Sequence, residues 1–389
     1  MKNFEYYTPT KVFFGKGNEE KIGEIIKSYG YKKVLLHYGQ GSVIKSGLLD
    51  IVKNRLSENG ISFLELGGVE PNPKLPLVQE GAALVKKESI DFILSIGGGS
   101  GIDSAKAIAL SVANDADAWD IITGKAKAEK GFPIGVILTI SAAGSEMSNS
   151  MVITNPDGML KRGFGTNLNR PVFAVMNPAL TCSVSKFQTG CGIVDIMMHT
   201  LERYFVLEPD NELTDRLAEA LLVSVKNAGS AAIENPDDYE ARATLMWASS
   251  LSHNDLTGCG KAYNFTVHML EHEISGMFDR VPHGAGLAIL FPAWAKYVYK
   301  YDVKKFAQLA TRVWGIDYDF ECPEKTALAG ISATEEYFKS LGMPVRLSEF
   351  DIHEDSFEEM ARKCTKHRPL YAGVPISDEH IVNIFKLAE

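Results

Sequence analysis

The chain has 389 residues, of which 45% are hydrophobic and 23% are charged, and its formal net charge is −9. This length predicts two or three domains and is sufficient to bury a large core. The acidic balance argues against nucleic acid or an anionic membrane as a partner, because both select basic surfaces.

The five cysteines are scattered and form no Cys-x-x-Cys pair. This usage favours reduced thiols over a disulfide framework. The first residues lack the apolar stretch of a signal peptide, and no apolar run reaches the length of a membrane span. We therefore expect a cytoplasmic protein that acts on a small molecule and has no membrane partner.

The first half of the chain alternates short apolar runs with amphipathic segments. Strands are predicted at 34–38, 61–66, 91–96 and 135–140, and helices at 45–57, 76–87 and 103–112. Such alternation indicates βαβ units that build a parallel sheet. Two more strands are predicted at 151–154 and 172–176, and an extra antiparallel ribbon is one arrangement for them.

Helical periodicity dominates the second half of the chain. Helices are predicted near 189–207, 211–229, 237–256, 261–276 and 284–299, and they are punctuated by Pro209, Pro236, Pro282 and Pro323. We therefore predict two domains, an α/β domain over residues 1–185 and an all-helical domain over residues 186–389.

A glycine-rich turn follows the predicted strand at 91–96. It consists of Gly97, Gly98, Gly99 and Ser100. Glycines let backbone N–H groups approach a phosphate, and the N-terminus of the next helix adds unpaired donors and a partial positive charge. The spacing is neither the GxGxxG fingerprint nor a Walker motif. A tight turn that needs positive φ is the alternative interpretation.

A second glycine turn follows the predicted strand at 34–38. It contains Gly39, Gln40 and Ser42, with Lys45 close behind, and it contains no Asp or Glu. Many NAD-specific enzymes hold the ribose 2′-hydroxyl with a carboxylate beyond a strand end. Backbone amides, a hydroxyl and a Lys suit a 2′-phosphate better, which favours NADP(H) over NAD(H). An ordinary turn capped by Ser42 is the alternative.

Three motifs in the helical half could bind a metal. Asp195 and His199 are four residues apart, His268 and His272 are four residues apart, and His283 follows Pro282. Residues four apart share one helix face. One Asp with several His suits a divalent first-row metal. Each motif alone also fits an ordinary polar contact or a packed histidine, but together they are compatible with one four-coordinate centre.

These motifs resemble those of the iron-containing alcohol dehydrogenases over nearly the whole chain. The resemblance includes Asp103 and Lys106 after the first glycine turn and Gly284 after His283. The turn at 38–42 is similar to that of the butanol-dehydrogenase-like aldehyde reductases, although Gln40 stands where this subgroup more often has Gly.

The resemblance implies a Rossmann-like dinucleotide-binding domain followed by an all-helical metal domain of the dehydroquinate-synthase type. It implies that the metal ligands are Asp195, His199, His268 and His283. It places His272 in proton relay beside the substrate and Asp103 near the nicotinamide, and it implies that both are catalytic residues. It assigns the pyrophosphate to residues 97–100 and the lining of the cofactor groove to Thr139, Ser141, Ser145 and Lys161.

The activity implied is hydride transfer between NADP(H) or NAD(H) and a small primary alcohol or aldehyde, such as butanol and butyraldehyde. One divalent metal is expected, Fe²⁺ first and Zn²⁺ or Ni²⁺ as alternatives, together with a homodimer. A glycerol- or diol-type dehydrogenase of the same fold and a metal-dependent hydrolase are the rival interpretations.

Overall fold

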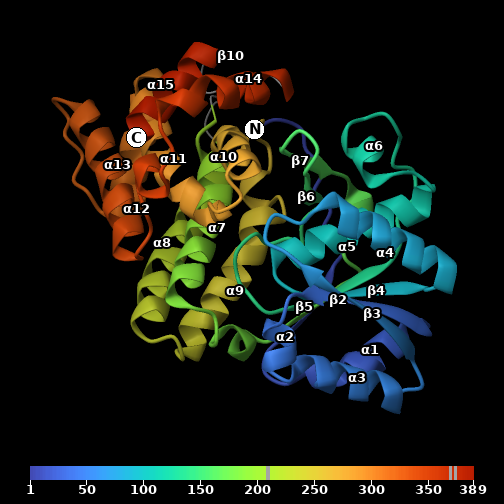
Figure 1. Cartoon of the computed structure of the whole chain (residues 1–389). Helices are drawn as coiled ribbons and strands as arrows, with labels where there is room; N and C mark the ends of the chain where they lie inside the picture. The colour runs from blue at the N-terminus through green and yellow to red at the C-terminus, as the bar shows by residue number, and fades with distance from the viewer. Residues whose placement is uncertain (207–210, 368–369, 372–374) are drawn as a thin grey trace. The chain divides into compact units, whose positions relative to one another are not determined.

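The computed structural model describes residues 1–206, 211–367, 370–371 and 375–389 (Figure 1). The chain forms two compact units: Tyr7–Ser183, and Val184–Glu389 together with Met1–Tyr6. We expected the first residues in the α/β domain. They cluster with the helical unit instead, where the N–H of Lys2 donates to the carbonyl of Gly260 at 2.9 Å.

The α/β unit is built on a six-stranded sheet in which every strand pair is parallel. In spatial order its strands are β1 (Lys11–Phe14), β8 (Phe173–Met176), β5 (Ile134–Leu138), β4 (Phe92–Gly97), β2 (Lys33–Gly39) and β3 (Ser62–Val69). Gly97 pairs with Leu138, and Gly39 pairs with Val69. The loops after β2, β4 and β5 therefore all leave the sheet at the carboxyl ends of its strands, where α/β proteins bind ligands.

Helices cover both faces of this sheet (Figure 1). They are α1 (Ile22–Ser28), α2 (Ser42–Lys45), α3 (Leu48–Glu58), α4 (Leu75–Glu88), α5 (Gly99–Asn114) and α6 (Ala118–Ile122). Along β2, Leu35 packs into the core beneath α4 and α5, whereas Val34 and Leu36 pack into the core beneath α1 and α3. This alternation matches the period of two of a strand buried on both faces.

Two predicted elements of this unit differ in the structure. The helix predicted at 45–57 is two helices, α2 and α3, because Gly47 adopts a φ of 76° that interrupts the helical backbone. The helix predicted from Asp103 begins earlier, at Gly99, directly after an extended Gly98.

The antiparallel ribbon is also formed by different strands from those predicted. Residues 172–176 contribute β8 to the main sheet, since all four residues of this strand are apolar and buried. The antiparallel ribbon is instead formed by β6 (Ser150–Asn155) and β7 (Leu160–Gly165), and β7 was not predicted.

The second unit is helical. Its helices are α7 (Lys186–Tyr204), α8 (Glu212–Glu234), α9 (Tyr239–His253), α10 (Thr266–Met277), α11 (His283–Val298), α12 (Val303–Trp314), α13 (Pro323–Ser340), α14 (Phe357–His367) and α15 (Asp378–Ala388). A two-stranded ribbon joins β9 (Leu370–Tyr371) and β10 (Pro375–Ile376). Leu207, the predicted end of the first helix, and Pro209 lie outside the described residues. Within the described part of the chain, no helix has both the length and the apolar composition needed to cross a bilayer.

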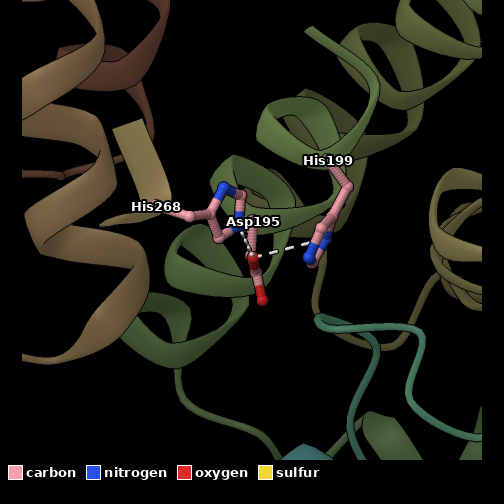
Figure 2. A group of neighbouring side chains, drawn as sticks. All are labelled: Asp195, His199 and His268. Atoms are coloured by element: carbon pink, nitrogen blue, oxygen red, sulfur yellow. Dashed lines mark ion pairs between the residues drawn. The ribbon is translucent and has the colours of Figure 1, made fainter. Parts of the chain in front are cut away.

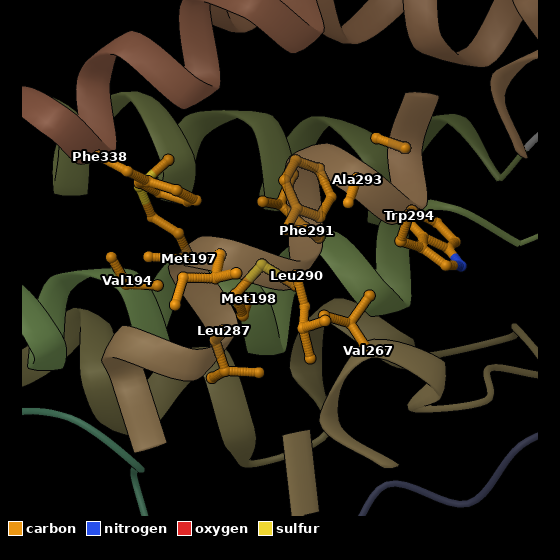
Figure 3. Packing of buried hydrophobic residues seen from close by; sticks show 14 of the residues in the cluster. Val194, Met197, Met198, Val267, Leu287, Leu290, Phe291, Ala293, Trp294 and Phe338 are labelled. Carbon is orange, nitrogen blue, oxygen red and sulfur yellow. The ribbon is translucent and has the colours of Figure 1, made fainter. Parts of the chain in front are cut away.

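The core of the helical unit holds α7, α10 and α11 together (Figure 3). Met197 and Met198 of α7, Val267 of α10, and Leu287 and Leu290 of α11 are all buried in one cluster. Because interiors are close-packed, this cluster fixes the three helices against one another. The polar residues on those helices are therefore held in fixed positions.

Candidate functional site

The predicted metal ligands converge in the helical unit, and Figure 2 shows three of them, Asp195, His199 and His268. Asp195 and His199 stand one turn apart on α7, and His268 stands on α10. Oδ1 of Asp195 lies 3.5 Å from Nδ1 of His199 and 3.5 Å from Nε2 of His268. The same oxygen lies 3.7 Å from Nε2 of His283, the first residue of α11. The structure thus brings all four residues together.

The donor set fits a divalent cation. Oδ1 of Asp195, Nδ1 of His199 and Nε2 of His268 are buried, and none has a hydrogen-bond partner among the described residues. Buried polar atoms are normally hydrogen-bonded, so three converging atoms without partners require an explanation. A carboxylate oxygen with imidazole nitrogens is a suitable ligand set for zinc or iron. The three residues offer ligand atoms within 4.8 Å of one another.

Two buried glutamates stand behind the histidines, and sequence reasoning missed both. The carboxylate of Glu202 bonds to Nδ1 of His268, and the carboxylate of Glu271 bonds to Nδ1 of His283. Each stands close in sequence to a predicted ligand: Glu202 is three residues after His199, and Glu271 is three residues after His268. The signal in the sequence that could have identified them is an acidic residue within an otherwise apolar helical segment.

Burial and neighbouring charges perturb the histidines in opposite directions. Burial, reinforced by His253 and His268, holds the pKa of His199 well below its ordinary value. Burial also lowers the pKa of His268, but the carboxylates of Glu202 and Asp195 outweigh it and raise that pKa to about 9. Metal ligands must give up their protons, so a cation that binds His268 has to displace one.

His272 lies beside this group. It is buried on α10, one turn after His268, and its ring centroid is 5.8 Å from that of His283. His272, Glu271 and His283 form a second group whose ligand atoms lie within 4.8 Å of one another. His272 is therefore close enough to act at the same site.

In the α/β unit, the glycine turn at 97–100 joins β4 to the N-terminus of α5. A Cβ atom on Gly98 would lie 2.1 Å from Cγ2 of Ile140, and one on Gly99 would lie 3.0 Å from Cβ of Ala143. The close approach of the loop after β5 thus requires glycine, especially at Gly98. The N-terminus of a long helix presents unpaired N–H groups suited to a phosphate.

The loop after β5 carries three of the predicted cofactor residues. The N–H of Thr139 donates to the carbonyl of Gly97 at 3.0 Å. Oγ of Ser141 is enclosed and has no hydrogen-bond partner in the described part of the chain. Ser145 lies further along the same loop. An enclosed hydroxyl without a partner, next to a glycine turn, suits a polar ligand.

Asp103 binds this loop. Its carboxylate accepts from the hydroxyl of Ser145 at 2.6 Å and from the N–H of Val152 at 2.9 Å. Burial raises the pKa of Asp103, against the nearby charges of Lys106 and Lys161. Lys161 itself is buried on β7. Asp103 therefore positions Ser145, and its predicted catalytic role stays a prediction.

The second glycine turn has an unexpected neighbour. Ser42 and Lys45 are exposed on α2, after Gly39 and Gln40. Nε2 of Gln40 donates to Oε1 of Glu70, which follows β3, at 3.4 Å. The sequence argument that this turn lacks a carboxylate is correct for residues 39–45 only, because Glu70, directly after the adjacent strand β3, supplies one.

The chain matches two family models. The model of the iron-containing alcohol dehydrogenases matches residues 9–178, and that of the C-terminal domain of the same family matches residues 189–388. The NADH-dependent butanol dehydrogenase A of Clostridium acetobutylicum is 44% identical, over 99% of each chain. The NADPH-dependent aldehyde reductase YqhD of Escherichia coli is 36% identical, over 94% of each chain.

A solved structure agrees with these sequence matches. The crystal structure of NADH-dependent butanol dehydrogenase A from Thermotoga maritima superimposes with a TM-score of 0.96 at 37% identity, covering 100% of this chain and 99% of that one. Family models, full-length relatives and fold therefore agree. The chain belongs to the iron-containing alcohol dehydrogenase family and is an NAD(P)-dependent oxidoreductase of alcohols and aldehydes.

Proposed function

We propose that the protein interconverts small primary alcohols and their aldehydes, with butanol and butyraldehyde as representative substrates, and that it uses one divalent metal, Fe²⁺. The convergence of Asp195, His199, His268 and His283 carries this proposal. The donor atoms of the first three are buried and lack hydrogen-bond partners among the described residues. The substrate class is supported by the name of the relative at 44% identity. Zn²⁺ and Ni²⁺ are the alternative metals.

The two units have separate roles in this proposal. The α/β unit, residues 7–183, binds the dinucleotide, and the backbone amides of Gly97, Gly98, Gly99 and Ser100 hold its pyrophosphate. Thr139, Ser141, Ser145 and Lys161 line the rest of the groove. The helical unit holds the metal through its Asp and three His.

The chemistry divides between bound groups and side chains. When bound, the metal supplies a Lewis acid for the substrate oxygen and the coenzyme supplies the hydride. His272 donates the proton that the substrate oxygen gains when the carbonyl is reduced, and accepts it in the reverse direction. Asp195, His199, His268 and His272 are themselves buried, which limits the access of water to this exchange.

NAD(H) is the coenzyme that we propose for this site. The sequence alone predicted NADP(H), because the second glycine turn offers backbone amides, the Ser42 hydroxyl and Lys45 and contains no carboxylate. Glu70 reverses that argument, because its carboxylate lies beside Gln40, where it would repel a 2′-phosphate and accept from a 2′-hydroxyl. The relatives include both types, an NADH-dependent enzyme at 44% identity and an NADPH-dependent one at 36%.

A homodimer and a cytoplasmic location complete the proposal. Strand β1 lies at one end of the sheet and pairs with β8 only, as far as the described residues show. An open sheet edge is a common surface for association with a second copy. Light scattering of the purified protein measures the oligomeric state directly. The cytoplasmic location stays a prediction from cysteine usage.

A coenzyme and metal screen tests the activity. Protein stripped of metal is reloaded with Fe²⁺, Zn²⁺ or Ni²⁺ and assayed with NADH and with NADPH, by the absorbance of the reduced nicotinamide. Short-chain aldehydes are compared with glycerol and diol substrates. We expect fastest turnover with Fe²⁺, NADH and butyraldehyde. Preference for glycerol would support the diol-type alternative, and no coenzyme oxidation with any aldehyde would contradict the proposal. The hydrolase alternative has no support from the family match.

A further inference from the structure

The two glutamates behind the ligand histidines are buried to an unusual degree. Glu202 is 3% exposed and Glu271 is 0% exposed. Burying a carboxylate costs several kcal/mol unless it is paired and hydrogen-bonded. Each of these carboxylates contacts Nδ1 of a different histidine, His268 or His283. Their burial therefore needs a role that depends on those two rings.

The contacts determine which ring nitrogen faces the other ligands. In the neutral ring that binds a metal, a carboxylate that accepts from Nδ1 leaves Nε2 as the nitrogen with a free lone pair. Nε2 of His268 is 3.5 Å, and Nε2 of His283 is 3.7 Å, from Oδ1 of Asp195. In both rings the carboxylate thus lies on one side and the convergent donor atoms on the other.

The glutamates also link the three helices that carry the ligands. Glu202 stands on α7 with Asp195 and His199, and it orients a ring on α10. It also accepts the N–H groups of Val267 and His268, at 2.6 and 3.1 Å, in the first turn of α10. Glu271 stands on α10 and orients a ring on α11. Each helix therefore positions the ligand of the next.

We propose that Glu202 and Glu271 are positioning residues of the metal centre, which hold His268 and His283 in the tautomer that offers Nε2 to the metal. This inference rests on the proposed metal ligands. His199 is held differently, because its ring packs against His253 with centroids 3.9 Å apart. Groups of this kind contribute roughly 10–100-fold to metal affinity.

Metal affinity of the stripped protein is the test. Wild type, Glu202→Gln and Glu271→Gln are titrated with Zn²⁺ against a chromophoric chelator, and the stability of each stripped protein is measured by urea unfolding. The matched control is Glu219→Gln, since Glu219 is also buried in the helical unit but accepts from Tyr204 at 2.8 Å and Arg312 at 3.0 Å. We expect Zn²⁺ to bind roughly 10–100-fold more weakly to the first two variants and unchanged to the control.

The outcomes separate the inference from the proposed function. If wild type binds no metal at this site, the proposed function fails. If wild type binds and both glutamine variants bind equally well, or if the control loses as much affinity, the inference is wrong. Should either variant not fold, ¹⁵N-histidine NMR of the Zn²⁺-loaded wild type tests the inference, because it identifies which ring nitrogen carries the proton. We expect Nδ1–H on His268 and His283, and Nε2–H on those rings would overturn the inference.

Discussion

His272 lies one turn after His268 on α10 and next to His283, and it does not belong to the group formed by Asp195, His199 and His268. This position suits proton transfer better than ligation. We predict that His272→Ala keeps its metal and lowers kcat by roughly 10²–10⁴-fold, the usual contribution of one proton-transfer group. Metal content by plasma mass spectrometry and kcat are measured on the same sample. His268→Ala is the comparison and should lose both; metal loss in His272→Ala would make His272 a ligand.

Glu70 determines the coenzyme preference if its carboxylate faces the ribose. Removing its charge removes the repulsion of a 2′-phosphate, worth on the order of 1 kcal/mol at a solvated site. We predict that Glu70→Gln raises the ratio of kcat/KM for NADPH to that for NADH by roughly fivefold. Glu58→Gln, at the exposed end of α3, is the control and should not change the ratio. An unchanged ratio in Glu70→Gln would exclude Glu70 as the discriminating residue.

His37 makes the stability of the α/β unit depend on pH. It is fully buried on β2, where Nδ1 donates to the carbonyl of Leu66 at 2.9 Å and Nε2 accepts from the hydroxyl of Ser104 at 2.8 Å. Burial lowers its pKa from 6.5 to about 4. The unfolded chain therefore binds the proton first, so this contribution is complete above pH 6.5 and is lost as the pH falls towards 4.

From this we predict that acidification from pH 7.5 to pH 5 costs about 2 kcal/mol through His37 alone. The measurement is urea unfolding of wild type and His37→Gln at both pH values, because glutamine keeps a donor and an acceptor but does not titrate. The free energy of unfolding should fall by about 2 kcal/mol less in the variant. An equal fall in both proteins would mean that His37 does not carry this dependence.

At the scale of elements, α5 is attached to the following loop and ribbon by one buried cation. Nζ of Lys106 donates to the carbonyls of Ser145, Ser148 and Ser150 at 2.7, 3.0 and 2.8 Å. Burial lowers the pKa of Lys106 to about 8. Loss of the ammonium would leave several buried carbonyls without this donor, at about 1–3 kcal/mol each.

We predict that Lys106→Met destabilises the protein by about 3 kcal/mol or more and raises KM for the coenzyme more than it lowers kcat, since the loop carries Ser145. Lys86→Met is the control, because Lys86 pairs with Asp115 at 2.6 Å on the surface, where such pairs contribute about 1 kcal/mol or less. Similar stability losses in both variants would contradict the assigned role of Lys106.

The elements also show which parts of a sequence can be interpreted locally. The alternating apolar runs predicted β2, β3, β4 and β5, and helix spacing placed Asp195 beside His199. Strand β7, in contrast, has the sequence LKRGFG, which has no strand pattern and becomes a strand because it pairs with β6. Strand β8 was predicted, but its place between β1 and β5 depends on residues far away in the chain.

The candidate site shows the same difference between local sequence patterns and tertiary contacts. The residue types of the proposed ligands and their spacing could be identified from local sequence. The contact of Glu202 with His268 spans 66 residues, and Glu70 reaches Gln40 only because β3 pairs with β2. Such partners depend on tertiary packing, and a glutamate that bonds to a histidine on another helix has no distinguishing local pattern. This explains why Glu202, Glu271 and Glu70 were missed, whereas the four proposed ligands could be named from their spacing.

At the scale of the molecule, each unit has its own hydrophobic core, and all four proposed metal ligands belong to the helical one. A ligand that binds only the folded state stabilises it, by about 4 kcal/mol at 1,000 times its Kd. Because the ligands come from α7, α10 and α11, metal binding should stabilise these helices together. Removal of the metal should then lower the stability of the helical unit and leave the stability of the α/β unit unchanged.

Hydrogen exchange measured by mass spectrometry tests this, because it reports on each segment separately. We predict that chelation of the metal accelerates exchange in peptides from α7, α10 and α11, and that peptides from β2, β4 and α5 keep their protection. Added NADH should slow exchange around residues 97–100 even in the metal-free protein, since the amides of that turn belong to the α/β unit. His268→Ala serves as the control, because its exchange should not respond to the chelator. Equal acceleration in both units would show that their stabilities are coupled, and no acceleration in α7, α10 and α11 would contradict a metal site on these helices.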